Sequence, residues 1–190
     1  MPPDEFLIRK IEPGDRVTGF SLGEENLQPL KTFLQREAIE HHACNLTKTY
    51  VLVDSQHDSE SDTNSPTVWG YISMLCSYVE LSDENQPGDV ENYYYQEFPA
   101  VKIARLAIDR RVQKGGLGKA LIRLAIATID EFIMPNIGCR FIVVDSKSAA
   151  VSWYSEQGFK IMATEEPQKS DATIMYLDLM NLDEQNGEQN

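Results

Sequence analysis

The sequence VKIARLAIDRRVQKGGLGKALIRLAIATI (residues 101–129) joins a strand, a turn and a helix. Val101–Ile108 is apolar and partly β-branched, which predicts a strand. The glycines of Gln113–Gly118 predict a tight turn. Apolar residues then recur at helical spacing along two stripes, so we expect a largely buried helix from about Leu117 to Met134.

A glycine-rich turn that opens a helix is suited to binding a phosphate. The first backbone N–H groups of a helix have no partner within the helix and point outward. The helix dipole adds about half a positive charge at that end. Glycine lets a phosphate approach the backbone without meeting a Cβ atom. We therefore expect an anionic, phosphate-bearing ligand at this turn.

Three phosphate-binding patterns compete for this turn. The nucleoside-triphosphate loop fails, because Gln113 stands in place of its first glycine and Ala120 in place of its Ser or Thr. The dinucleotide pattern G-x-G-x-x-G is absent as well. The third pattern is Gln or Arg, two residues, Gly, one residue, then Gly or Ala. Gln113–Gly118 fits this third pattern in full.

The rest of the chain predicts a mixed α/β fold. Ser21 and Glu24 match a capping box, so we expect a helix from there to about Ala43. A second helix is expected from Ser148 to a left-handed cap at Gly158. The further strands are expected at Phe6–Phe20 (in part), Tyr50–Val53, Val68–Val79 (a hairpin with the preceding strand), Arg140–Val144, Phe159–Met162 and Thr173–Leu179. Helices interleaved with strands in this order predict a mixed sheet with helices packed on it.

Length and charge limit the function. The chain has 190 residues and a formal net charge of −13, which argues against DNA and disfavours RNA. We expect one domain over residues 1–180 and a disordered polar tail over 181–190. No apolar run is long enough to span a membrane, and no secretory signal opens the chain, so a cytoplasmic protein is expected. Lys102–Arg123 nevertheless holds seven basic residues and one acidic residue.

The three cysteines predict neither a disulfide framework nor a metal site. Cys44, Cys76 and Cys139 are far apart, odd in number and set in apolar surroundings. We expect reduced thiols in or near the core. No close Cys/His spacing indicates zinc, so no metal is expected.

Three motifs in order resemble the GNAT superfamily of N-acetyltransferases. They are the turn Gln113–Gly118, the later AVSWYSEQGF (residues 150–159), and ARLAID (residues 104–109), which is similar to a strand of the subgroup that includes bacterial tRNA-acetylating toxins. The resemblance implies a twisted mixed sheet of about six to seven strands with about four helices. It also implies an acetyl-CoA-dependent acyltransferase and suggests a homodimer.

The resemblance assigns roles to particular residues. The turn would hold the pyrophosphate of acetyl-CoA, and the strand before it would offer backbone groups to pantetheine, with the Ile108 N–H as a candidate oxyanion donor. Tyr154 would protonate the departing thiolate; packing against the sheet is its alternative role. Lys147 replaces an Asn of many family members, so that contact is not carried over. The cofactor-binding residues expected on this basis are Leu106, Ala107, Ile108, Gln113, Lys114, Gly115, Gly116, Leu117, Gly118 and Lys119.

No general base is evident. The strand Val101–Ile108 has no carboxylate, which leaves Glu80, Glu97 and Asp109 as candidates. His41 and His42 are adjacent, so on a helix they point about 100° apart and are expected at the surface. An α-amine, whose pKa lies near 8, would need little help from a base.

Two classes of acceptor and one non-enzymatic function stay open. The stretch 50–101 has no Lys or Arg, and such an acidic region would attract a cationic amine. We therefore expect direct acetyl transfer to a primary amine of a small molecule or peptide. The first alternative is a toxin-type enzyme that acts on the α-amine of aminoacyl-tRNA, in which Arg105 is of interest. The second is a non-catalytic, CoA-binding regulatory domain.

Overall fold

The computed structural model describes residues 6–54, 65–81, 86–90, 93, 95–162 and 172–182. Within these residues, seven strands pair in the order β1-β2-β3-β4-β5-β7-β6, and four α-helices accompany them. The expected mixed sheet is therefore confirmed. The strands are β1 (Phe6–Lys10), β2 (Lys48–Asp54), β3 (Val68–Glu80), β4 (Glu97–Ile108), β5 (Phe141–Lys147), β6 (Lys160–Ile161) and β7 (Ala172–Asp178).

The helices are shorter than the sequence pattern suggests. Short 3-10 segments also occur at Glu25–Leu27, Ser148–Ala150 and Leu179–Asn181, and a π-helical turn at Ile129–Ile133 follows α3 directly. The α-helices are α1 (Gln28–Arg36), α2 (Ala38–Ala43), α3 (Leu117–Thr128) and α4 (Val151–Glu156).

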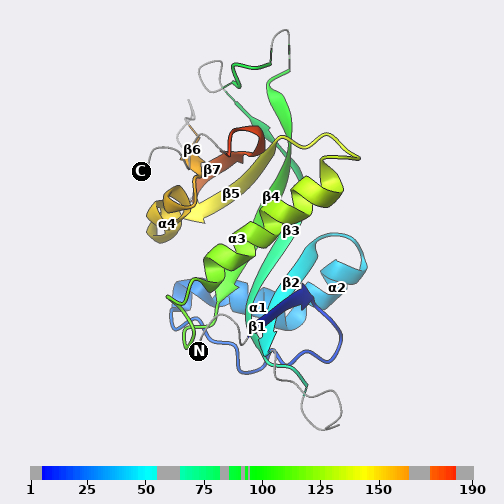
Figure 1. The fold of residues 1–190 in the computed structure, drawn as a ribbon. Coiled ribbons are helices and arrows are strands. Elements are labelled where there is room, and N and C mark those ends of the chain that lie inside the picture. The colour runs from blue at the N-terminus through cyan, green and yellow to red at the C-terminus, as the bar shows by residue number, and fades with distance from the viewer. Residues whose placement is uncertain are drawn as a thin grey trace. The chain divides into compact units, whose positions relative to one another are not determined.

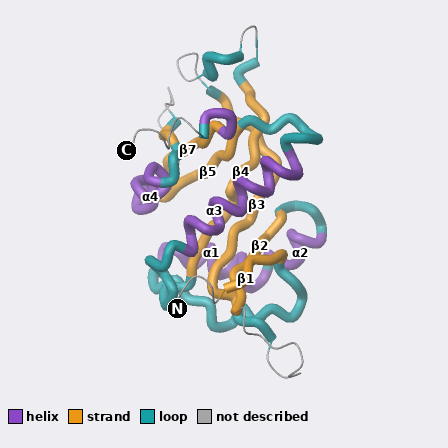
Figure 2. Tube along the Cα trace, in the orientation of Figure 1, coloured by secondary structure: helices purple, strands orange, loops and turns teal. Residues whose placement is uncertain are grey.

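The chain divides into two compact units, residues 1–75 with 104–124 and residues 76–103 with 125–190. In the first unit, β1, β2 and the start of β3 lie side by side and antiparallel (Figures 1 and 2). Val51 pairs with Tyr71, which confirms the expected hairpin. The core of this unit gathers Phe20, Phe33 and Tyr71, and the buried Tyr71 hydroxyl donates to the Leu30 carbonyl at 2.7 Å.

The single long helix expected from Ser21 to Ala43 is wrong. The helical segments begin only at Glu25, and α1 ends where Glu37 leaves helical backbone angles, before α2 starts. No side-chain cap forms at Glu24. The Ser21 N–H donates instead to the Asp109 carboxylate at 2.8 Å, which ties this segment to the residue that follows β4.

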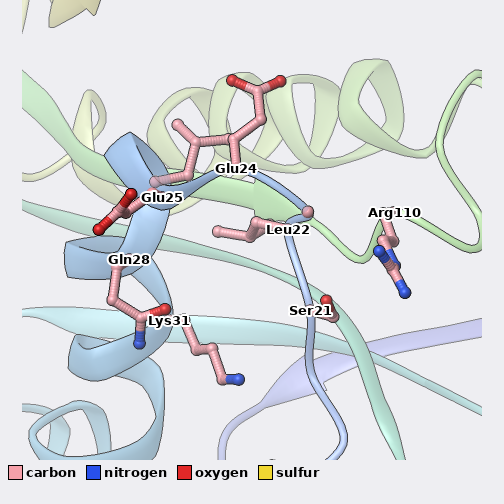
Figure 3. A pocket seen from close by; sticks show the side chains of 9 residues that line it. Ser21, Leu22, Glu24, Glu25, Gln28, Lys31 and Arg110 are labelled. Atoms are coloured by element: carbon pink, nitrogen blue, oxygen red, sulfur yellow. The ribbon is translucent and has the colours of Figure 1, made fainter.

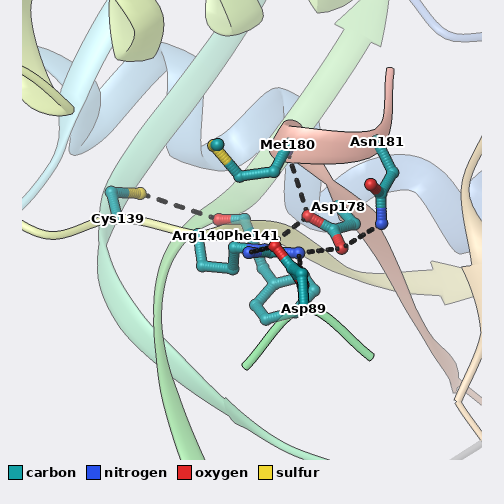
Figure 4. A network of polar contacts seen from close by, with 7 residues as sticks. All are labelled: Asp89, Cys139, Arg140, Phe141, Asp178, Met180 and Asn181. Carbon is teal, nitrogen blue, oxygen red and sulfur yellow. Dashed lines mark hydrogen bonds and ion pairs between the residues drawn. The ribbon is translucent and has the colours of Figure 1, made fainter. Parts of the chain in front are cut away.

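In the second unit, β4 and β5 run parallel, and β7 pairs antiparallel with both β5 and β6 (Figure 1). Its core joins Phe98, Phe141 and Tyr176 through edge-on ring contacts. The Arg140 guanidinium binds two carboxylates, Asp178 at 2.7 Å and Asp89 at 2.9 Å (Figure 4). This network joins the segment before β4 to the start of β5 and the end of β7.

Other expectations have mixed outcomes. Cys139 is buried, but Cys44 and Cys76 are exposed, so their expected place in or near the core is wrong. The expected tail 181–190 lies outside the described residues from position 183 onward. No helix in the described part of the chain is long and apolar enough to cross a membrane. Those same residues contain no group of three or more metal-ligating side chains of the His, Cys, Asp or Glu type.

Candidate active site

The end of β4 leads directly into the glycine-rich turn. The parallel ladder between β4 and β5 comprises four described pairs and ends at Ile103 opposite Val144. Ala104–Ile108 lie beyond this ladder, so their backbone groups on that edge are not used in pairing with β5. These residues include Leu106, Ala107 and Ile108, for which cofactor binding stays a prediction.

The turn is exposed and contains two residues with positive φ angles. Lys114 has φ +67° and Gly116 has φ +76°, and residues 113–116 are exposed. Leu117 is buried and begins α3. The Gln113 side chain donates to the Ile108 carbonyl at 3.0 Å and so ties the turn back to the strand. The first N–H groups of a helix lack partners within the helix, so phosphate binding at the start of α3 stays a prediction.

Some of the seven basic side chains between Lys102 and Arg123 contact other protein groups, so fewer of them are available to a ligand than the sequence suggests. Lys102 pairs with Asp145 at 2.6 Å, and the Arg105 guanidinium lies 3.7 Å from the centre of the Phe33 ring. Arg111 is bound to Asp109. Of the seven basic residues between 102 and 123, the exposed ones that make no such contact with another described residue are Arg110, Lys114, Lys119 and Arg123.

Asp109 is ruled out as the general base by its environment. Its side chain is fully buried and accepts hydrogen bonds from Arg111 and from the Ser21 backbone. Burial raises the pKa of this carboxyl, but the hydrogen bonds from Arg111 and Ser21 outweigh burial and hold the pKa below its usual value. Glu80 and Glu97, the other candidates, are exposed and lie on β3 and β4.

A polar pocket of about 400 Å³ lies next to Arg110 (Figure 3). Gly23 (φ +80°) is packed under the Arg110 side chain, where an added Cβ would lie 3.3 Å from Cδ. The pocket carries both signs of charge, so its chemistry suits a ligand with both anionic and cationic groups. Its lining residues are Ser21, Leu22, Gly23, Glu24, Glu25, Leu27, Gln28, Lys31 and Arg110.

Tyr154 lies on α4 and is only 6% exposed. Its ring packs edge-on against Trp153 and Phe159, at centroid distances of 4.9 and 5.3 Å. Gly158 has φ +90°, which confirms the expected left-handed cap, and the Phe159 N–H then donates to the Tyr154 carbonyl. Burial raises the pKa of the Tyr154 phenol well above its ordinary value, which keeps the proton available for donation.

Comparison with known sequences decides the family. The sequence model of the acetyltransferase (GNAT) domain matches residues 73–178, more than half of the chain. The chain belongs to this family. The protein is therefore an acyltransferase, and its matched region includes the end of β4, the glycine-rich turn and α4.

This acetyltransferase is also similar to characterised toxins. A tRNA-acetylating toxin of Mycobacterium tuberculosis (strain ATCC 25618 / H37Rv) is 28% identical over 158 residues, which are 83% of this chain and 86% of the relative. The structure of AtaT complexed with acetyl-methionyl-tRNAfMet superposes with a TM-score of 0.76, at 20% identity, over 95% of this chain and 99% of AtaT. A tyrosine-to-phenylalanine mutant of the AtaT toxin, bound to the C-terminus of the antitoxin AtaR and acetyl-CoA, gives 0.72 at 19% identity over 97% and 100%.

Two features of the acetyltransferase were missed by reasoning from the sequence. The first is the pocket formed by Arg110, the segment before α1 and the first turns of α1, for which the sequence gives no signal because Arg110 is remote in the chain. The second is the pairing of Arg111 with Asp109. The acid of the ARLAID motif followed by two arginines was a signal for it, but the arginines were counted in the basic cluster expected near an anionic cofactor.

Proposed function

We propose that the protein transfers the acetyl group of acetyl-CoA to the α-amine of an aminoacyl-tRNA. The observation that carries this proposal is the sequence similarity to a tRNA-acetylating toxin over most of both chains. It supports aminoacyl-tRNA as acceptor better than the small or peptidyl amine that the acidic composition favours. Acetyl-CoA as donor is supported by family membership and by the exposed glycine-rich turn that precedes α3.

In this mechanism the protein contributes mainly by binding and orienting acetyl-CoA, and less by proton transfer. The amides of the turn and of the start of α3 hold the pyrophosphate, and the end of β4 positions the thioester. A backbone donor to the developing oxyanion contributes about 3–4 kcal/mol to the rate. The α-amine is substantially neutral near pH 8, so attack proceeds without a strong base. This fits the loss of Asp109 as a base candidate, and Tyr154 then protonates the thiolate.

The net charge of −13 limits how the protein engages tRNA. The exposed cations Arg110, Lys114, Lys119 and Arg123 form a short basic stretch around the turn. Such a stretch neutralises few phosphates, so the affinity for tRNA falls only shallowly with salt. Recognition then depends on the aminoacylated end of the tRNA, where the reacting amine lies.

The test is acetyl incorporation from radiolabelled acetyl-CoA. We expect label on a pool of aminoacyl-tRNAs and none on the same tRNAs after deacylation. Amino acid esters and spermidine, which carry the amine without the RNA, serve as competing acceptors. Label on the small amines but not on aminoacyl-tRNA would contradict the proposal. Binding of acetyl-CoA with no label on any acceptor would indicate the non-catalytic alternative.

Expression in bacteria gives an independent readout. Acetylated aminoacyl-tRNA cannot serve in elongation, because its α-amine is blocked. We therefore expect growth arrest on expression of the wild-type protein and relief of the arrest by Tyr154→Phe.

A further inference from the structure

We infer that the Asp109 carboxylate is a positioning residue that sets the affinity for acetyl-CoA by holding the glycine-rich turn. This inference rests on the proposed function, because it takes acetyl-CoA as the ligand of the turn. Asp109 lies between the last residue of β4 and the turn, and its side chain is fully buried. It therefore acts on a ligand only through other residues.

Both carboxylate oxygens of Asp109 are saturated with donors. Oδ1 accepts the Arg111 backbone N–H at 3.0 Å and its Nε at 2.7 Å. Oδ2 accepts Arg111 Nη2 at 2.8 Å and the Ser21 backbone N–H at 2.8 Å. A buried carboxylate is costly unless it is paired and hydrogen-bonded in this way. The ionised side chain is thus a fixed junction between the end of β4 and the segment before α1.

The junction extends through Arg111 to β3. The Arg111 guanidinium lies over the Trp69 ring, 4.5 Å from its centre, and donates to the Gly19 carbonyl at 3.0 Å. The Trp69 carbonyl accepts the Asp109 N–H at 2.7 Å, and the Trp69 indole N–H donates to Asp54. Arg111 is thereby directed toward the protein, although nearly half of its side chain is exposed.

The same junction fixes the path of the chain into the turn. The Val112 N–H donates to the Asp109 carbonyl at 3.0 Å, and the Gln113 side chain donates to the Ile108 carbonyl at 3.0 Å. Loss of the Asp109 charge frees Arg111 and loosens this path. The amides of residues 113–118 then sample more orientations, and ordering them on binding weakens the complex. The expected loss is in acetyl-CoA affinity, while the chemical step is retained.

Asp15 provides a matched control for a merely structural role. Its side chain is 2% exposed and accepts a guanidinium, that of Arg9, together with the Glu12 backbone N–H at 2.9 Å. The chemistry is the same as at Asp109, but Asp15 follows β1 and has no contact with the turn in the described structure. Asp15→Asn and Asp109→Asn remove the same charge and keep the same side-chain shape.

The experiment measures five quantities in both variants. They are the melting temperature, the acetyl-CoA Kd by calorimetry, kcat and KM for acetyl-CoA, and hydrogen exchange of residues 110–118 without cofactor. Both variants are expected to have a lower melting temperature than the wild-type protein. Asp109→Asn is expected to raise Kd and KM about tenfold, to leave kcat within about threefold, and to speed exchange in the turn. Asp15→Asn is expected to leave Kd, KM and the exchange of the turn unchanged.

A second variant covers the case in which Asp109→Asn does not fold. Arg111→Lys keeps the positive charge but loses the planar fork that spans both carboxylate oxygens, so a smaller shift in the same direction is expected. Unchanged Kd and exchange in the Asp109 or Arg111 variant, or an equal shift in Asp15→Asn, would overturn the inference. If the wild-type protein does not bind acetyl-CoA, the proposed function fails, and faster exchange confined to the Asp109 variant still supports the positioning role.

Discussion

Replacement of Tyr154 by Phe tests the chemistry most directly. The substitution removes one hydroxyl and retains the ring, with its contacts to Trp153 and Phe159. The side chain is 6% exposed and lies on α4, so the fold is expected to lose no more than about 1 kcal/mol. An effect on the rate then reports the hydroxyl proton and not a change in packing.

The magnitude follows from the role of a general acid. A positioned acid contributes roughly 100- to 10,000-fold to a rate, which corresponds to about 3–5 kcal/mol of barrier. Burial raises the pKa of the Tyr154 phenol, so the wild-type acid is fully protonated at neutral pH. We therefore expect kcat to fall at least about 100-fold in Tyr154→Phe, with the acetyl-CoA Kd within about twofold.

The assay follows release of the CoA thiol with saturating acetyl-CoA and aminoacyl-tRNA, with Kd measured separately by calorimetry. Tyr176→Phe is the matched control, because Tyr176 is also a buried tyrosine, 7% exposed on β7, with its ring 5.8 Å from Phe141. Removal of that hydroxyl is expected to leave kcat unchanged. A Tyr154→Phe rate within threefold of wild type, or an equal fall in both variants, would refute the acid role and favour simple packing.

Three further predictions concern pH and packing. A phenol must be protonated to donate, and burial raises the pKa of Tyr154, so kcat is expected to show no decline through the ordinary tyrosine pKa near 10; a fall centred there in the pH–rate profile would contradict this. Gly70→Ala places a Cβ 2.6 Å from the Ile108 Cδ1 atom. We expect this variant to lose about 1–2 kcal/mol of unfolding free energy in chemical denaturation and to have a higher acetyl-CoA KM. An unchanged KM would show that the end of β4 does not position the cofactor. Arg140→Gln leaves Asp178 without its bidentate partner and is expected to destabilise the fold by about 2 kcal/mol with kcat retained; loss of turnover at full stability would argue against a structural role.

Local patterns were predicted well because their causes are local. The helix after the glycine-rich turn begins at Leu117 as expected, and its buried face follows i, i+4 spacing through Leu117, Leu121 and Ala125. The cap at Gly158 and the hairpin of β2 with β3 likewise depend on neighbouring residues. The expected strand at Val101–Ile108 is present but begins earlier, at Glu97.

Long-range contacts account for most of the errors. Ser21 matches a capping box, yet its N–H donates to Asp109, 88 residues away. Asp109 was a candidate base because the sequence gives no sign that the distant Ser21 N–H would bind the same carboxylate as Arg111. Arg105 counted as an available cation, but its guanidinium lies over Phe33. In each case at least one partner remote in sequence, Asp109 for Ser21, Ser21 for Asp109 and Phe33 for Arg105, helps to determine what the residue does.

The sequence predicts only the part of the candidate site that lies on one continuous segment. The turn and the end of β4 are adjacent in sequence, so the glycine spacing suffices to predict a binding loop there. The pocket beside Arg110 needs the segment before α1, and no periodicity or motif relates the two. The positions expected to bind the cofactor and Tyr154 stay predictions, which the variants above address.

The boundaries of the two compact units have a consequence for how the protein is made. They lie inside β3, β4 and α3, at 75/76, 103/104 and 124/125, and never in a loop. The first unit includes residues 104–124, and Ala107 belongs to its core, so we expect the leading 75 residues to complete this core only after that later stretch has been translated. A ribosome that stalls early releases a chain that lacks both the glycine-rich turn and a complete core. Truncated products are therefore expected to be cleared by proteases before they can acetylate anything.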